Sequence, residues 1–218
     1  KNMDEFIKNT NELLAQKVVK ALQKRNFEAY YAENKEQAKD FILKSISKDE
    51  VISWGGSVTV DELNLKENFK KFGYKTLDRD SAKTPQEKEE IILKSLTSDV
   101  FLMSANALSE DGEIVNIDKK GNRIAALCFG PKKIFVIVGM NKIVKSLDDA
   151  ISRARNFAAP INAQRVSKVY EMNTPCLNTG SCADCKMQDS ICSHILITRL
   201  SSPKGRINVV IVNENLGF

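Results

Sequence analysis

The feature that most constrains the fold is a regular alternation of short apolar runs with amphipathic segments along most of the chain. Runs of strand length lie at residues 27–32, 51–54, 74–77, 99–103, 134–138 and 207–213. Segments with apolar residues at helical spacing lie at residues 3–25, 35–46, 61–72, 85–96, 124–129 and 147–166. Such alternation favours right-handed crossovers and a largely parallel sheet flanked by helices. We therefore predict an α/β fold in which the strands near residues 51, 74, 100, 134 and 207 share one core.

Length and patterning predict a single domain spanning residues 1–218. The 218 residues fit one large domain, and no repeat, low-complexity stretch or long linker interrupts them. A stretch at 113–117, flanked by Asp-Gly and Lys-Lys-Gly, is typical of a hairpin arm. We expect four parts: a helical part at 1–48, an α/β core at 49–166, a cysteine-rich loop at 167–194 and C-terminal strands at 195–218.

Composition and charge exclude several classes of protein. Hydrophobic residues make up 42% and charged residues 28%, which excludes a disordered or fibrous chain. The net charge is only +5, and both signs are scattered along the sequence, so we expect no nucleic-acid partner. No apolar run approaches the roughly 18 residues of a membrane span, and no secretory h-region is present. We therefore expect a cytoplasmic protein without a membrane span.

Three strand ends carry small and polar residues. In open α/β sheets ligands bind at the carboxyl ends of the strands, so these ends indicate one shared cleft. Each position taken alone has a simpler explanation, because strand-to-helix turns and surface hairpins also use Gly, Asn and Asp. The candidate ligand-binding residues are Gly55, Gly56, Ser57, Thr59, Ser104, Asn106, Asp111, Asn116, Asp118, Asn122 and Arg123.

The residue types of this cleft indicate an anionic ligand. Backbone N–H groups at Gly55 and Gly56 can approach an anion at a helix start. The Arg123 guanidinium can hold a carboxylate or phosphate through two parallel hydrogen bonds. Asn116 and Asp118, two residues apart, face the same side of a strand. The carboxylates of Asp111 and Asp118 suit hydroxyl recognition or proton transfer beside the anion. A small hydroxy acid or a phosphorylated metabolite combines these groups.

Four cysteines within a short segment indicate a metal site or a redox centre. A [4Fe–4S] cluster and a closed zinc site each take four thiolates. Irregular spacing leaves both open, with the iron–sulfur cluster favoured, zinc as the alternative and free thiols as a third possibility. His194 is expected at the surface or as a cap, with metal ligation as the less favoured alternative. Cys128 lies in an apolar stretch and is expected to be a buried thiol. The four candidate metal ligands are Cys176, Cys182, Cys185 and Cys192.

Short motifs spread over nearly the whole chain carry a family resemblance. They lie at residues 53–59, 78–80, 104–107, 111–118, 121–123, 129–133 and 158–163, with a cysteine-bearing tail from 174 to 207. Together they resemble the LUD-domain proteins of the LutC/YkgG lactate-utilisation family, in a cysteine-bearing branch. The resemblance implies a NagB/RpiA/CoA-transferase-like fold, with a glycine-rich ligand loop at 55–57 and the hairpin at 111–118 flanking the pocket.

Three functions stand as hypotheses. The resemblance implies a component of L-lactate or other 2-hydroxy-acid utilisation that works with iron–sulfur redox partner proteins. One alternative is a transferase or isomerase-type enzyme that binds a small anion and carries a structural metal. Another is a non-catalytic module that senses metal or redox state. Whether the chain is an enzyme stays open at this point, because a fold does not fix a reaction.

Overall fold

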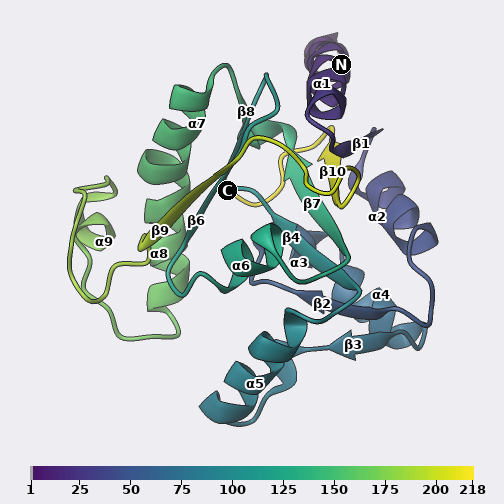
Figure 1. The fold of residues 1–218 in the computed structure, drawn as a ribbon. Helices are drawn as coiled ribbons and strands as arrows, with labels where there is room; N and C mark the ends of the chain where they lie inside the picture. The colour runs from purple at the N-terminus through teal and green to yellow at the C-terminus, as the bar shows by residue number, and fades with distance from the viewer. Residues whose placement is uncertain (1) are drawn as a thin grey trace.

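The centre of the molecule is a six-stranded parallel sheet, seen in a computed structural model that describes residues 2–218, with side chains from residue 4 onward (Figure 1). Every neighbouring pair of strands is parallel. The predicted α/β fold is confirmed, and the strand expected at 27–32 joins the other five at one edge. In spatial order the strands are β1 (Glu28–Ala32), β10 (Ile207–Val212), β7 (Lys133–Gly139), β4 (Val100–Ser104), β2 (Val51–Trp54) and β3 (Lys75–Leu77).

Helices cover both faces of this sheet, because its strands turn apolar side chains alternately to either side. Val136 on one face packs with Leu22 of α1 and with α6, and Phe135 on the other face packs with α2, α3 and α4. Figure 1 shows α5 beside β3. The helices are α1 (Asn2–Lys24), α2 (Lys35–Lys44), α3 (Val58–Glu62), α4 (Leu65–Lys71), α5 (Pro85–Ser95) and α6 (Asn122–Cys128).

A smaller, four-stranded sheet follows from the end of β4. Its strands, in spatial order, are β8 (Ile143–Val144), β5 (Ala107–Ser109), β6 (Ile114–Asp118) and β9 (His194–Thr198). The expected hairpin arm is β6, which runs antiparallel to both β5 and β9. Alanines of α7 (Leu147–Arg153) and α8 (Ala159–Ser167) pack on this sheet. The short helix α9 (Pro175–Thr179) lies in the cysteine-rich loop, at the left of Figure 1.

Two expected helices differ from the structure. The segment 61–72 forms two helices, because Asn64 adopts a left-handed φ of 52° between α3 and α4. The long helix expected at 147–166 contains a π-helical segment, Ala154–Ala158, between α7 and α8. Segments of this kind occur often at functional sites, and this one lies between the smaller sheet and the cysteine-rich loop.

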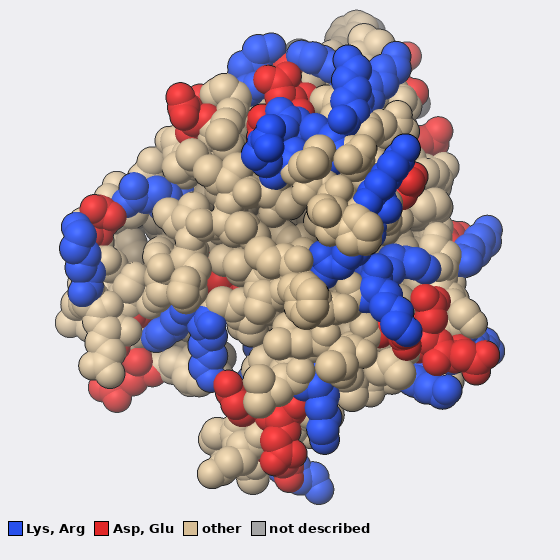
Figure 2. All heavy atoms as spheres, in the orientation of Figure 1, with Lys and Arg blue, Asp and Glu red and all other residues tan. Residues whose placement is uncertain are grey.

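Charges of both signs cover the surface. On the face shown in Figure 2, Lys and Arg groups are interleaved with Asp and Glu groups. Several form ion pairs, such as Lys66 with Asp61 and Lys132 with Asp99, each at 2.7 Å. Among residues 2–218, none of the helices has both the length and the apolar character needed to cross a bilayer.

Candidate functional site

A cavity of about 670 Å³ lies at the carboxyl ends of β2, β4 and β6. Its wall carries more positive than negative side chains, and such an excess favours a negatively charged ligand. The basic lining residues are Arg79, Lys83, Lys88, Lys119, Lys120, Arg123, Lys142 and Arg165. The acidic ones are Glu89, Asp118 and Glu171.

Most of the predicted ligand-binding residues come together at this cavity. They follow β2, end β4 and connect β6 to α6, so the topology joins three strand ends at one place. Their role in binding stays a prediction. The predicted residues that line the cavity are Gly56, Ser57, Thr59, Ser104, Asn106, Asp118, Asn122 and Arg123.

Arg123 is held by its neighbours in the protein. Its Nε lies 3.3 Å from Oδ2 of Asp118, and its Nη2 donates to the carbonyl of Ile117 at 2.6 Å. Asp118 also accepts a hydrogen bond from the backbone N–H of Arg123 at 3.0 Å, which places a negative charge at the start of α6. The two-bond clamp of a ligand by Arg123 stays a prediction. The Nε edge is already engaged, and the guanidinium offers a ligand its remaining N–H groups.

Gly55 differs from its predicted role as part of a ligand loop. It lies behind the cavity wall, and a Cβ there would come within 2.6 Å of both Cγ and Cδ of Arg123. Its N–H donates to the carbonyl of Leu102 at 3.0 Å, which continues the pairing of β2 with β4. Gly55 thus lets the arginine stem cross the strand end, and its own N–H is not available to an anion.

Asn116 and Asp111 lie outside the cavity lining, which corrects two of the predictions. Asn116 is 1% exposed, and its Nδ2 donates to the carbonyl of Ser104 at 3.0 Å, so it joins β6 to the end of β4. Asp111 lies at the β5–β6 turn, where its carbonyl accepts a hydrogen bond from Arg25 at the end of α1. A strand rises about 3.3 Å per residue, so Asp111 and Asp118, at opposite ends of the arm, cannot reach one small ligand.

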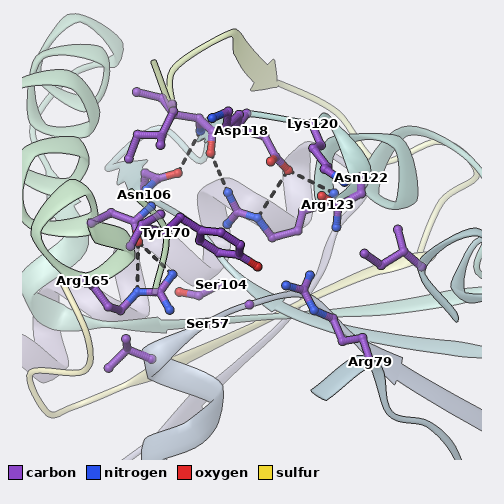
Figure 3. A pocket seen from close by; sticks show the side chains of 18 of the residues that line it. Ser57, Arg79, Ser104, Asn106, Asp118, Lys120, Asn122, Arg123, Arg165 and Tyr170 are labelled. Carbon is purple, nitrogen blue, oxygen red and sulfur yellow. Dashed lines mark hydrogen bonds and ion pairs between the residues drawn. The ribbon is translucent and has the colours of Figure 1, made fainter. Parts of the chain in front are cut away.

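Two further arginines face the cavity. Figure 3 shows the side chains of Arg79 and Arg165 directed into the same space as Arg123, with Tyr170 across the view. Nε and Nη2 of Arg165 donate to Oδ1 of Asn162 at 3.0 and 2.9 Å. Burial, and then the positive charge of Arg123, lower the pKa of Arg165. The buried Nε of Arg79 has no hydrogen-bond partner within residues 2–218, and Oδ1 of Asp80 lies 3.7 Å from it.

A buried lysine completes the basic wall. Lys142 follows β7 and is only 3% exposed. Its Nζ donates to Thr59 Oγ1 at 2.9 Å, to Ser104 Oγ at 3.0 Å and to the carbonyl of Ala105 at 3.2 Å. In the part of the chain that the structure describes, no carboxylate oxygen lies within 4.0 Å of this amine. Burial, and then the positive charge of Arg153, lower the pKa of Lys142 to about 7.

Comparison with known proteins places the chain in a family. The LUD domain model matches residues 15–212. The chain belongs to the LUD-domain family. This confirms the predicted resemblance, and the family as a whole is associated with lactate utilisation.

The fold of this LUD domain recurs in a solved structure. The crystal structure of a DUF162 family protein from Deinococcus radiodurans has a TM-score of 0.53 at 13% identity, covering 93% of this chain and 97% of that chain. A further match is eIF2B delta from Chaetomium thermophilum, with a TM-score of 0.34 at 12% identity, covering 69% of this chain and 57% of that chain. No curated protein matches the chain.

The four late cysteines of this LUD domain lie in the loop between α8 and β9, and each is partly exposed. Burial, and then the negative charges of Cys182, Cys185 and Cys176, raise the pKa of Cys192 to about 11. The other three thiols therefore lie within electrostatic range of Cys192. Across residues 2–218, no three His, Cys, Asp or Glu side chains are arranged to hold a metal ion. The donors suit a thiophilic metal in type and number, and both the cluster and the zinc stay predictions.

The cysteine-rich loop also forms part of the cavity wall. Tyr170, near its start, and Ile191, near its end, both line the cavity. His194 follows the loop, is exposed, and lies beside the start of α6, where a Cβ on Gly121 would be 3.4 Å from its Cδ2. Cys128, expected to be buried, is exposed at the other end of α6, because this helix turns its apolar side toward the sheet.

The basic residues missing from the predicted set differ in how far the sequence marks them. Lys142 follows the strand predicted at 134–138. The end of that strand is not included among the three candidate strand ends, and including it would indicate Lys142. Arg79 lies within a motif that carries the family resemblance, at 78–80. Arg165 lies on a predicted helix, and only the packing of α8 shows that it faces the cavity.

Proposed function

We propose that this LUD-domain protein binds a small anionic metabolite in the cavity at the carboxyl ends of β2, β4 and β6. The observation that carries the proposal is the convergence of Arg79, Arg123 and Arg165 on one space. Positive charges gathered in a partly buried site repel one another, and a bound anion lowers that energy. The family's association with lactate utilisation makes a 2-hydroxy acid the first candidate, within a pathway linked to iron–sulfur electron transfer.

The polar groups of the wall divide into two sets with different roles. The guanidinium groups suit a carboxylate or phosphate. Asp118 holds Arg123 in place through the ion pair at 3.3 Å. The hydroxyls of Thr59 and Ser104 and the amide of Asn122 suit a ligand hydroxyl. A 2-hydroxy acid presents a carboxylate beside a hydroxyl, and therefore uses both sets.

The size of the cavity also bears on the ligand. Its volume of about 670 Å³ falls within the range of roughly 300–1,000 Å³ that is typical of small-molecule sites. A three-carbon acid fills only part of that space. A phosphorylated metabolite is therefore the second candidate, which also keeps a transferase or isomerase-type activity as the alternative function.

Thermal unfolding in the presence of candidate ligands tests the proposal. L-Lactate, pyruvate and sugar phosphates are expected to raise the unfolding temperature, and the neutral analogues lactamide and glycerol are not. Arg165→Gln keeps most of the side-chain stem and removes the charge, so affinity should fall on the order of tenfold to a hundredfold, as for a lost charged hydrogen bond. The matched control is Arg199→Gln, an exposed arginine away from the cavity. Equal shifts for charged and neutral compounds, or unchanged affinity in Arg165→Gln, would refute the proposal.

For the cysteine-rich loop we propose a metal centre, with a [4Fe–4S] cluster as the first candidate and zinc as the second. Support comes from the thiolate charges that act on Cys192. When bound, an iron–sulfur cluster supplies electron transfer, whereas a closed zinc site supplies structure alone. The residues that would hold either group are Cys176, Cys182, Cys185 and Cys192.

Metal analysis of anaerobically purified protein tests this second proposal. Iron with sulfide, or zinc, is expected at one centre per chain, and serine at any of the four positions should lower the content because a closed site needs every thiolate. Cys128→Ser is the control, since that thiol is exposed at the end of α6. Metal-free wild-type protein would remove the proposal. A metal centre that is lost or oxidised in air, in a protein that turns over no substrate, would favour the module that senses metal or redox state.

A further inference from the structure

We propose that Lys142 is a nucleophile that forms an imine with the carbonyl carbon of an anionic aldehyde or ketone bound in the cavity. The shared chemistry of the ligand is a carbonyl close to a carboxylate or phosphate, as in a 2-oxo acid or an open-chain sugar phosphate. The inference rests on the proposed anion binding and adds a reacting group to the same site.

The position of Lys142 is the first argument. The residue belongs to the cavity wall and is 3% exposed, so a ligand reaches the amine by way of the cavity. Its partners are three neutral oxygens, from Thr59, Ser104 and Ala105. These contacts fix the amine at the end of β4, the strand end where ligands of α/β sheets bind.

The charges around Lys142 are the second argument. No carboxylate oxygen within residues 2–218 lies within 4.0 Å of the amine. The charged groups that act on it are Arg153 of α7, Glu62 of α3 and Arg123 of α6, and two of these three are positive. A buried ammonium without a carboxylate partner is costly, so the amine gives up its proton readily. With the pKa near 7, it holds roughly a thousand times more free amine at neutral pH than a surface lysine does.

The neighbouring groups suit the reaction. Arg123 lines the cavity and also acts electrostatically on Lys142, so an anion held by Arg123 places an adjacent carbonyl close to the amine. The hydroxyls of Thr59 and Ser104 lie within 3.0 Å of Nζ and can pass protons to and from the reacting atoms. The side chain of Arg153 donates to the carbonyls of Asn106 and Asn141, which fixes the residue before the lysine and the segment that follows β4.

The step balances without an oxidant or reductant. The lone pair of Nζ attacks the carbonyl carbon, and the carbonyl oxygen takes up a proton to give a carbinolamine. Loss of a proton from nitrogen and departure of the hydroxyl as water leaves a carbon–nitrogen double bond. Overall, one amine and one carbonyl give one imine and one water, and hydrolysis reverses the step.

Reductive trapping followed by peptide mapping tests the inference on the full chain. The protein is incubated with cyanoborohydride and either pyruvate or glyceraldehyde 3-phosphate, and the two arms distinguish an oxo acid from a sugar phosphate. Propanal is the neutral control. The anionic carbonyl compounds are expected to label Lys142 at least about tenfold more than any exposed lysine, because of its larger free-amine fraction. Added lactate or inorganic phosphate should suppress the labelling.

Variants and outcomes separate this inference from the proposed function. Lys142→Arg should abolish the trapped product, whereas Lys132→Arg, at an exposed lysine paired with Asp99, should leave it unchanged. If Lys142→Arg fails to fold, the peptide map of the labelled wild-type protein alone decides whether Lys142 is the reacting residue. Labelling spread evenly over exposed lysines, or none at all, would overturn the inference. Anions that raise the unfolding temperature without any labelling leave the proposed function standing, and the absence of both effects refutes both.

Discussion

Replacing Lys142 by methionine should change how the stability of the protein depends on pH. The folded protein holds the pKa of this amine at about 7, against 10.5 for an ordinary lysine. Well below pH 7 the folded and unfolded chains both carry the proton, so the lysine adds no pH dependence there. Between pH 7 and the ordinary value, the unfolded chain keeps a proton that the folded chain has released. The free energy of unfolding therefore rises with pH in that window.

The size of the effect follows from the two pKa values. Each pH unit well inside the window adds about 1.4 kcal/mol to the free energy of unfolding. Integrating the proton difference gives about 2 kcal/mol between pH 7 and pH 9, but only about 0.4 kcal/mol between pH 6 and pH 7. Methionine has a similar length and no titratable group. The stability of the wild type relative to Lys142→Met should therefore grow by these amounts, even though the variant also loses three hydrogen bonds.

Urea unfolding at several pH values measures this difference. Other groups that titrate in the same range are present in both proteins, so their contributions cancel. The matched control is Lys66→Met. Burial disfavours the charge of Lys66, but its hydrogen bonds and ion pairs with Asp61 and Asp80 outweigh this and raise its pKa, so its proton stays on in both states. Parallel stability curves for wild type and Lys142→Met between pH 7 and pH 9 would refute the reasoning.

Two further substitutions test the positioning of Arg123. Gly55→Ala places a Cβ 2.6 Å from Cγ and Cδ of Arg123 and should cost about 1–3 kcal/mol in urea unfolding while weakening anion binding. Gly56→Ala is the control: its Cβ would lie 3.8 Å from Arg79, and the free energy of unfolding should change by no more than about 0.5 kcal/mol. Equal losses of stability in the two variants would contradict the close passage of the Arg123 side chain over Gly55. Asp118→Asn should lower stability by roughly 1–3 kcal/mol, because Arg123 loses its charged partner. The same variant removes a negative charge from the cavity wall and should bind inorganic phosphate more tightly at low salt in calorimetry. Weaker binding would contradict this prediction and show that the positioning of Arg123 by Asp118 outweighs the charge.

The sequence predicts the fold well because its signals are local. Apolar runs of four to seven residues mark the strands, and their alternation with helices is enough to indicate a parallel sheet. The rule that ligands bind at strand ends then locates the cavity, since residues after β2 and β4 and at the end of β6 meet there. Two of the errors are also local. Asn64 interrupts a helix by its left-handed φ, and Cys128 lies on the exposed side of α6.

The basic wall of the site was harder to predict because it depends on tertiary packing. Arg165 lies on a helix with nothing in its neighbours to mark it, and it meets Arg123 only because α8 packs across the smaller sheet. Asp111 shows the opposite failure. An aspartate is a residue type that suits a ligand-binding site, but the β5–β6 turn places Asp111 beside the end of α1. Gly55 fits the site for a reason the sequence does not show, which is the space it leaves for an arginine stem.

The cavity lies where the two sheets meet, and this placement explains its chemistry. β4 ends at Ser104 and the chain enters β5 at Ala107, so the residues between them belong to neither sheet. Polar groups must satisfy the backbone there: Asn116 donates to the carbonyl of Ser104, Lys142 to that of Ala105 and Arg153 to that of Asn106. Arg153 is positive, Lys142 is positive whenever its amine is protonated, and the carbonyls they bond are neutral. The junction is therefore held together by groups whose charge is left uncompensated, and an anion is the component that would balance it.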